Sequence, residues 1–196
     1  MGNSHRGFES HALRMGRVIY SAIASLDGYV NNEQGDFGWA MPDEDVHAYV
    51  NDLMRPIRTH LYGRRLYEVM AAWQTMGTTP DEPEVIRDFG DQWRAADKVV
   101  YSTALEEVST PRTRLERSFE PGAVRGLDGD VLVGGPGLAA HAFRAGLVDR
   151  VSLIVVPAVV GGGTAALPAG VQLGLELLDE HRFASGFVAL SYTVSR

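Results

Sequence analysis

Residues 130–168, DVLVGGPGLAAHAFRAGLVDRVSLIVVPAVVGGGTAALP, decide the fold that this sequence predicts. The stretch reads as an apolar strand, a glycine turn, a helix, a second apolar strand and a second glycine loop. The first strand, 130–133, is a short apolar run without alternation, which is typical of a strand buried on both faces. The turn at 134–137 leads into a helix that we expect to begin near Gly137 or Leu138. Backbone N–H groups at such a helix start are unpaired and lie at its positive end, so the pattern predicts a seat for a phosphate group.

The composition is that of a soluble globular protein with one domain. The chain has 196 residues, of which 45% are hydrophobic and 22% charged, and a formal net charge of −7. This acidic balance argues against a nucleic-acid partner. The absence of cysteine excludes disulfides, thiolate metal sites and a cysteine nucleophile, and the scattered histidines predict no metal site.

No apolar run approaches the length of a membrane span, so we expect no membrane partner. The beginning of the chain is too polar for a secretory signal, which favours a cytoplasmic location. Residues 1–14 are expected to be a loosely ordered extension ahead of a single domain at 15–196.

Outside the opening stretch, strand and helix patterns alternate along the chain. The predicted strands are 17–25, 59–62, 98–101 and 112–115; the predicted helices are 64–72, 84–96 and one that follows an N-cap at Asp43; the predicted loops are 26–42, 73–83 and 161–170. A turn at Ser185-Gly186 predicts a C-terminal antiparallel hairpin. Together these patterns predict an α/β fold, with a mostly parallel central sheet covered by helices on both faces.

In such a sheet, ligands bind at the carboxyl ends of the strands. Four strand ends carry small, polar or basic residues, at 25–28, 63–65, 102–103 and 134–135. The sequence therefore predicts that these four segments meet at one edge.

Five motifs carry a family resemblance: IASLDGYV (23–30), LYGRRLYE (61–68), VVYST (99–103), VLVGGPGL (131–138) and GLVDRVSLIVVPAVVGGG (146–163). In this order and spacing, the chain resembles the dihydrofolate reductase-like superfamily, in the branch that holds the C-terminal reductase domain of riboflavin-biosynthesis proteins. The resemblance implies a three-layer dihydrofolate reductase-like fold and NADPH-dependent hydride transfer to a pteridine- or pyrimidine-type substrate. It also implies a homodimer, for which the segment 146–156 and the adjoining hairpin offer apolar strand edges.

The resemblance and the strand ends together assign site residues. Those assigned to the cofactor are Ala24, Gly63, Arg64, Arg65, Ser102, Thr103, Val133, Gly134, Gly135, Gly137 and Leu138. Those assigned to the substrate are Ser25, Tyr29 and Trp39, with Asp27 as the catalytic residue. A partly buried carboxyl group at a strand tip has a raised pKa, which would suit Asp27 to pass a proton.

Each assignment has a structural alternative. The glycines also fit a tight strand–helix turn, the arginine pair a solvated surface, Ser102-Thr103 a turn or cap, and Asp27-Gly28 a simple turn. Leu66 stands where the family commonly has a threonine that meets cofactor phosphate, and Arg150 stands where an acidic residue is common. Two other functions therefore stay open: a nucleotide-binding module without catalysis, and a different enzyme on a doubly wound sheet.

Overall fold

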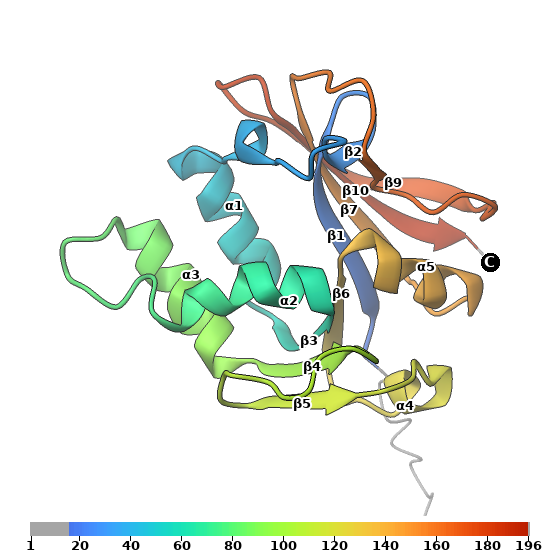
Figure 1. The fold of residues 1–196 in the computed structure, drawn as a ribbon. Coiled ribbons are helices and arrows are strands. Elements are labelled where there is room, and N and C mark those ends of the chain that lie inside the picture. Colours follow the sequence, from blue (N-terminus) through green and yellow to red (C-terminus); the bar gives the residue numbers. More distant parts are fainter. Residues whose placement is uncertain (1–15, 196) are drawn as a thin grey trace, which may run out of the picture.

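The protein is built on one eight-stranded sheet, seen in a computed structural model that describes residues 16–195 (Figure 1). The expected extension at 1–14 lies outside the described residues. The strand order is β5-β4-β3-β6-β1-β7-β10-β9. The bounds are β1 Val18–Ser25, β3 Ile57–Gly63, β4 Asp97–Tyr101, β5 Thr113–Glu116, β6 Asp130–Gly134, β7 Arg150–Val156, β9 Gly174–Arg182 and β10 Val188–Ser195. The strands from β5 to β7 in this order are parallel, and β10 and β9 form the antiparallel hairpin that the sequence predicted.

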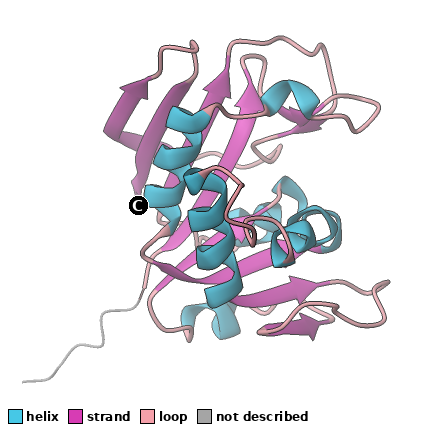
Figure 2. Ribbon diagram, turned by 90° about the vertical axis from the view of Figure 1, so that its left-hand side faces the viewer, coloured by secondary structure: helices cyan, strands magenta, loops and turns pink. Residues whose placement is uncertain are grey.

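Helices cover both faces of the sheet, as predicted (Figure 2). Their bounds are α1 Glu44–Met54, α2 Arg64–Met70, α3 Glu84–Ala95, α4 Pro121–Arg125 and α5 Pro136–Arg144, with short 3₁₀ turns at Gly38–Ala40 and Ala71–Gln74. Buried side chains of α1, α2 and α3 pack on one face, and those of α4 and α5 on the other. No helix within residues 16–195 is both long and apolar enough to cross a membrane.

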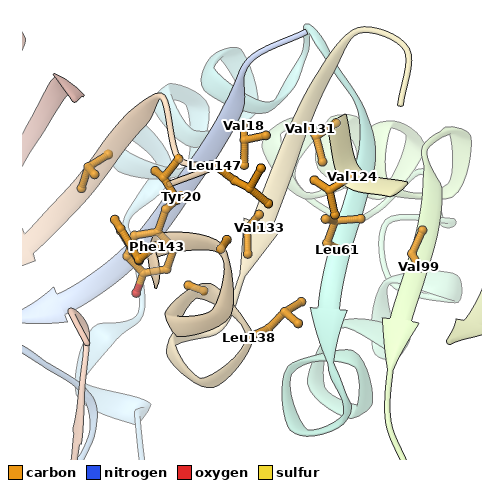
Figure 3. Close-up of a cluster of buried hydrophobic side chains, with 14 residues drawn as sticks. Val18, Tyr20, Leu61, Val99, Val124, Val131, Val133, Leu138, Phe143 and Leu147 are labelled. Atoms are coloured by element: carbon orange, nitrogen blue, oxygen red, sulfur yellow. The ribbon is translucent and has the colours of Figure 1, made fainter. Parts of the chain in front are cut away.

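The β6–α5–β7 unit shows why the opening stretch determines the fold. Val131 and Val133 of β6 lie in the cluster under α5, whereas Leu132 lies in the cluster on the opposite face (Figure 3). The prediction of a strand buried on both faces is therefore confirmed. The helix begins at Pro136 rather than at Gly137 or Leu138, because the fixed φ of proline and its missing N–H suit the first helical position.

Helix α1 begins where its N-cap was predicted. The Asp43 carboxylate accepts a hydrogen bond from Val46 N at 2.9 Å. This bond satisfies one of the unpaired N–H groups of the first turn.

Two predictions were incomplete or wrong. The loops at 26–42 and 161–170 contain a second small sheet, in which β2 (Tyr29–Asn31) pairs with β8 (Thr164–Ala165). The segment 146–156 does not offer a free strand edge, because β7 lies between β1 and β10. The edge on this side of the sheet is β9 instead.

Candidate functional site

Three of the predicted segments meet at the carboxyl edge of the sheet. Strands β4, β3 and β6 are parallel neighbours, and their register aligns Tyr62 with Gly134 and Gly63 with Tyr101. The residues that follow these strands, at 63–65, 102–103 and 134–137, therefore leave the sheet at one level. The parallel topology thus gathers these segments as the sequence predicted.

The fourth segment, at the end of β1, lies further along. Strand β1 pairs with β6 as far as Tyr20 but with β7 as far as Ser25. Five residues of strand span roughly 16 Å, so the carboxyl edge is stepped. Within the described sheet, the β6-facing backbone edge of β1 between 21 and 25 has no strand partner. Ala24 lies on this edge with its side chain buried, so it can offer a ligand backbone atoms only.

The glycine turn between β6 and α5 leaves amide groups open. Gly135 is the N-cap, with φ +84°, and no side chain caps the helix. The Ala139 N–H donates to Gly135 O at 3.0 Å. The N–H groups of Gly137 and Leu138 precede this bond and have no helical partner. A Cβ added at Gly137 would meet nothing within 4 Å, so that position faces open space.

Gly134, by contrast, is enclosed by protein. A Cβ at this position would lie 2.7 Å from Leu66 Cδ2 and 3.1 Å from ring atoms of Tyr62. Close packing against neighbouring side chains, rather than approach of a ligand, explains why glycine is needed here. The side chains of Val133 and Leu138 are also buried in the core, so both residues can reach a ligand only through their backbone.

The starts of α2 and α5 are adjacent. A Cβ added at Gly63 would lie 3.8 Å from Leu138 Cβ. Leu66, in the first turn of α2, packs its side chain on Gly134 and Gly135. The position at which the family commonly has a hydroxyl thus carries an apolar cover over the glycine turn, and this contact was not evident from the sequence.

The two arginines at the start of α2 differ in their partners. Arg64 forms an exposed ion pair with Glu68, with 2.9 Å between Nη1 and Oε1. Arg65 is exposed, and within residues 16–195 its guanidinium has no hydrogen bond or ion pair. Arg65 is therefore the more available of the two for an anionic group.

Ser102 and Thr103 begin a turn at the end of β4. The Ser102 Oγ accepts hydrogen bonds from the N–H groups of Ala104, at 3.2 Å, and Leu105, at 2.9 Å. Arg117 braces the same turn by donating to the Ser102 carbonyl at 3.0 Å. The turn alternative for Ser102 is thus correct, although its O–H remains able to donate.

The expectation of a raised pKa for Asp27 is wrong. Its carboxylate is exposed and accepts hydrogen bonds from Gly161 N at 2.8 Å and from Val160 N at 3.1 Å. A hydrogen bond from the Ser25 hydroxyl, followed by these backbone donors, lowers its pKa. Asp27 is therefore ionised at neutral pH and ties the end of β1 to the loop after β7.

The residues assigned to the substrate surround this turn. The Ser25 side chain is buried and accepts a hydrogen bond from Tyr29 N at 3.0 Å. Trp39 is half-buried and donates through Nε1 to Asp36 O at 3.2 Å. Leu26 and Met41 are close to these residues in the sequence and expose 67% and 68% of their surface. Exposed apolar side chains of this kind suit contact with a flat ring. The sequence analysis did not single them out, because their exposure depends on the fold.

Two hollows in the described surface lie away from this edge. One of about 270 Å³ lies between α5 and β10 and is lined by Phe143 and Val194. The other, of about 370 Å³, lies at the amino ends of β1 and β7. The carboxyl edge is therefore defined by open amide groups and exposed side chains rather than by either hollow.

A sheet of this topology with a stepped carboxyl edge defines the class of proteins with a dihydrofolate reductase-like fold. The dihydrofolate reductase of Enterococcus faecalis, complexed with NADP(H), superposes with a TM-score of 0.61 and 13% identity, covering 93% of this chain and 98% of that one. The chain belongs to the RibD C-terminal domain family, which matches residues 17–120 and 123–189.

Two further proteins are similar over almost their whole length. A putative riboflavin biosynthesis protein from Shewanella sp. PV-4 superposes with a TM-score of 0.72 and 17% identity, covering 92% of this chain and 99% of that one. The uncharacterized protein YyaP of Bacillus subtilis is 24% identical over 185 residues, which cover 92% of this chain and 96% of YyaP.

Proposed function

We propose that the chain is an NADPH-dependent oxidoreductase that transfers hydride to a pteridine- or pyrimidine-type heterocycle. The observation that carries the proposal is that the start of α5, with its open amides, adjoins the start of α2, with the unpaired Arg65, at the carboxyl edge of the sheet. The chain also belongs to the RibD C-terminal domain family. An uncapped helix start attracts anions through its N–H groups and its positive dipole end. An open amide pair at one helix start and a guanidinium group at the adjoining helix start suit the diphosphate and the 2′-phosphate of such a cofactor.

The cofactor residues then divide by position. The amides of Gly137 and Leu138 bind the pyrophosphate, and the turn at Gly134-Gly135 positions them. Gly63 allows the starts of α2 and α5 to approach, and Val133 contributes its backbone at the strand end.

The two ends of the cofactor site lie on opposite sides of the glycine turn, one toward β4 and the other at β1. Arg65, supported by Arg64 and by the hydroxyl groups of Ser102 and Thr103, binds the 2′-phosphate. The unpaired backbone edge of β1 at Ala24 is assigned to the nicotinamide, which supplies the hydride when it is bound.

The substrate is assigned to the end of β1. Ser25, Tyr29 and Trp39 form the wall there, and exposed Leu26 and Met41 extend it. Asp27 is ionised and held by the loop at 160–161, so in this assignment it fixes the end of β1 instead of donating a proton to the heterocycle. A riboflavin-type pyrimidine and a pteridine are both candidate substrates. We also propose a cytoplasmic location.

Binding of nicotinamide cofactors tests the assignment of the phosphate groups. Calorimetry with NADPH and with NADH compares the wild type with Arg65→Ala and with the matched neighbour Arg64→Ala. We expect Arg65→Ala to narrow the preference for NADPH by about tenfold, because a charged hydrogen bond is lost, and Arg64→Ala to have the smaller effect. If neither variant narrows the preference, the 2′-phosphate assignment fails.

A second candidate, a nucleotide-binding module without catalysis, is favoured by two observations. Leu66 covers the glycine turn with an apolar side chain, and Asp27 is held as a structural carboxylate. Following NADPH absorbance with pteridine and pyrimidine substrates separates the candidates. Binding that raises thermal stability, without NADPH consumption, would favour the module.

We also propose that the protein forms a homodimer through the exposed face of β9. All nine residues of this edge strand are exposed, and Leu175, Leu177 and Leu178 are 41%, 53% and 47% exposed. Exposed leucines on an unpaired edge strand invite association with another chain.

A further inference from the structure

A second cluster of charged side chains lies at the opposite end of the sheet from the carboxyl edge. The cavity of about 370 Å³ is lined by residues at the start of β1, the end of α4, the loop into β7 and the end of β10: Gly16, Arg17, Val18, Val124, Arg125, Leu147, Asp149, Arg150 and Thr193. Figure 1 shows α4 beside the beginning of β1, at this end of the molecule. Its volume suits a small molecule.

The cavity is basic although the protein is acidic. Three arginines and one aspartate line it, and Asp130 pairs with one of these arginines, which leaves a surplus of one positive charge in a chain of net charge −7. Arg17 is already paired, because its guanidinium donates to both carboxylate oxygens of Asp130. The Asp149 carboxylate accepts a hydrogen bond from Val18 N at 2.9 Å.

The other two arginines are not used by the fold. Within residues 16–195, no hydrogen bond or ion pair joins the guanidinium of Arg125 or Arg150 to another residue. The charge of Arg150 lowers the pKa of Asp130, but less than the hydrogen bonds and the charge of Arg17 do. Two available guanidinium groups facing one cavity are suited to forked hydrogen bonds with a carboxylate or phosphate group.

The apolar residues of the cavity belong to the core. Val18, Val124 and Leu147 line it, and all three lie in the buried cluster under α5 (Figure 3). They expose only 5%, 2% and 2% of their surface, so the accessible lining comes mainly from the polar and charged residues around them.

We propose that this cavity binds a small organic anion, a carboxylate or a phosphate monoester, between Arg125 and Arg150. The site is separate from the proposed reductase site, because β6 begins beside it at Asp130 and ends at the glycine turn. Binding here does not depend on the assignment of the carboxyl edge.

Calorimetry with butyrate, butyl phosphate and neutral butyramide tests the site on the whole chain. We expect saturable binding of at least one of the two anions and none of butyramide, with the tighter anion identifying the source of the charge. The double variant Arg125→Ala/Arg150→Ala should bind that anion at least about tenfold more weakly. Arg144→Ala, which removes an exposed arginine of α5 outside the cavity, should bind as the wild type does.

The single variant Arg125→Glu keeps the test decisive if the double variant does not fold, because the Arg125 side chain is exposed. It should abolish anion binding and leave NADPH binding unchanged. The proposal is overturned if the wild type binds neither anion at millimolar concentration, or if Arg125→Glu binds as tightly as the wild type. A wild-type protein that does not bind NADPH would instead count against the proposed reductase function. That result would not affect the proposal of an anion site.

Discussion

At the scale of single residues, the site separates side chains that hold the fold from those that are free to act. Asp27 and Gly134 looked alike in the sequence, since both follow a strand directly. In the structure, Asp27 accepts hydrogen bonds from two backbone N–H groups of another loop, and Gly134 is enclosed by Leu66 and Tyr62. Arg65 and Gly137 have no such contacts among the described residues, so they are better candidates for ligand binding.

Replacement of Asp27 tests its structural role. Asp27→Ala should lower the melting temperature more than Asp27→Asn, because the amide keeps one acceptor oxygen for the loop at 160–161. Turnover of NADPH should change little in Asp27→Asn at a temperature where it is folded. Thermal melts and steady-state rates of both variants check this. Loss of turnover in Asp27→Asn with an unchanged melting temperature would assign Asp27 to the chemistry instead.

The glycine turn allows a matched pair of variants. Gly134→Ala should destabilise the protein by about 1–3 kcal/mol, because its Cβ would overlap Leu66 and crowd Tyr62. Gly137→Ala should leave stability unchanged or slightly raised, because its Cβ enters open space on a helix. Denaturant unfolding measures both.

Addition of Leu66→Ala gives the control for this pair. It should recover part of the loss in Gly134→Ala, since the two side chains would compete for one space. Additive losses in the double variant would contradict the contact between Leu66 and Gly134.

At the scale of elements, β3 and β4 bring two buried basic groups together. Their register aligns His60 with Lys98, which are 3% and 1% exposed. Burial, and then the charge of Lys98, lowers the pKa of His60 to about 4. Burial, and then Arg112, lowers the pKa of Lys98 to about 8, although its Nζ donates to the carbonyls of Trp93 at 3.0 Å and Ala96 at 2.9 Å.

Lys98 gives this strand pair a defined pH dependence. Between its folded pKa of about 8 and its ordinary value of 10.5, the unfolded chain binds more protons, so folding becomes more favourable as pH rises. The free energy of unfolding of the wild type should therefore rise relative to that of Lys98→Met between pH 8 and about 10. Urea unfolding of both proteins at several pH values measures the difference. A constant difference over this range would contradict the lowered pKa.

The elements themselves were largely predictable, and the contacts between them were not. Strong apolar runs predicted β1, β6 and β7, and the carboxylate of Asp43 predicted the start of α1. The two short strands β2 and β8 escaped notice, because so few residues carry no periodicity and their pairing joins distant loops. The contact of Leu66 with the glycine turn and the hydrogen bonds of Asp27 to the loop at 160–161 join residues far apart in the sequence, so they could not be predicted either.

At the scale of the whole molecule, the sheet edge formed by β9 is exposed. Strand β9 has hydrogen-bonded neighbours on one side only, and its leucines are exposed. Natural edge strands usually avoid such surfaces, because they promote association. The residues of the carboxyl edge and of the basic cavity lie on elements other than β9.

Leu177→Lys tests the proposed dimer. A charge on β9 should convert the wild-type dimer to a monomer, because its burial against a second chain would be costly. Leu26→Lys, which changes a still more exposed leucine on the β1–β2 turn, should remain a dimer. Light scattering coupled to size exclusion measures the mass of each. A monomeric wild type would contradict the proposal.

The place of β10 in the strand order affects how the protein is made. Strand β10 follows β9 in the sequence but lies between β7 and β9, so β9 is joined to the rest of the sheet only through β10. The pairing of β9 therefore depends on a segment that is synthesised after it. Any change that unfolds β10 would also release β9, because β10 is an interior strand of the sheet.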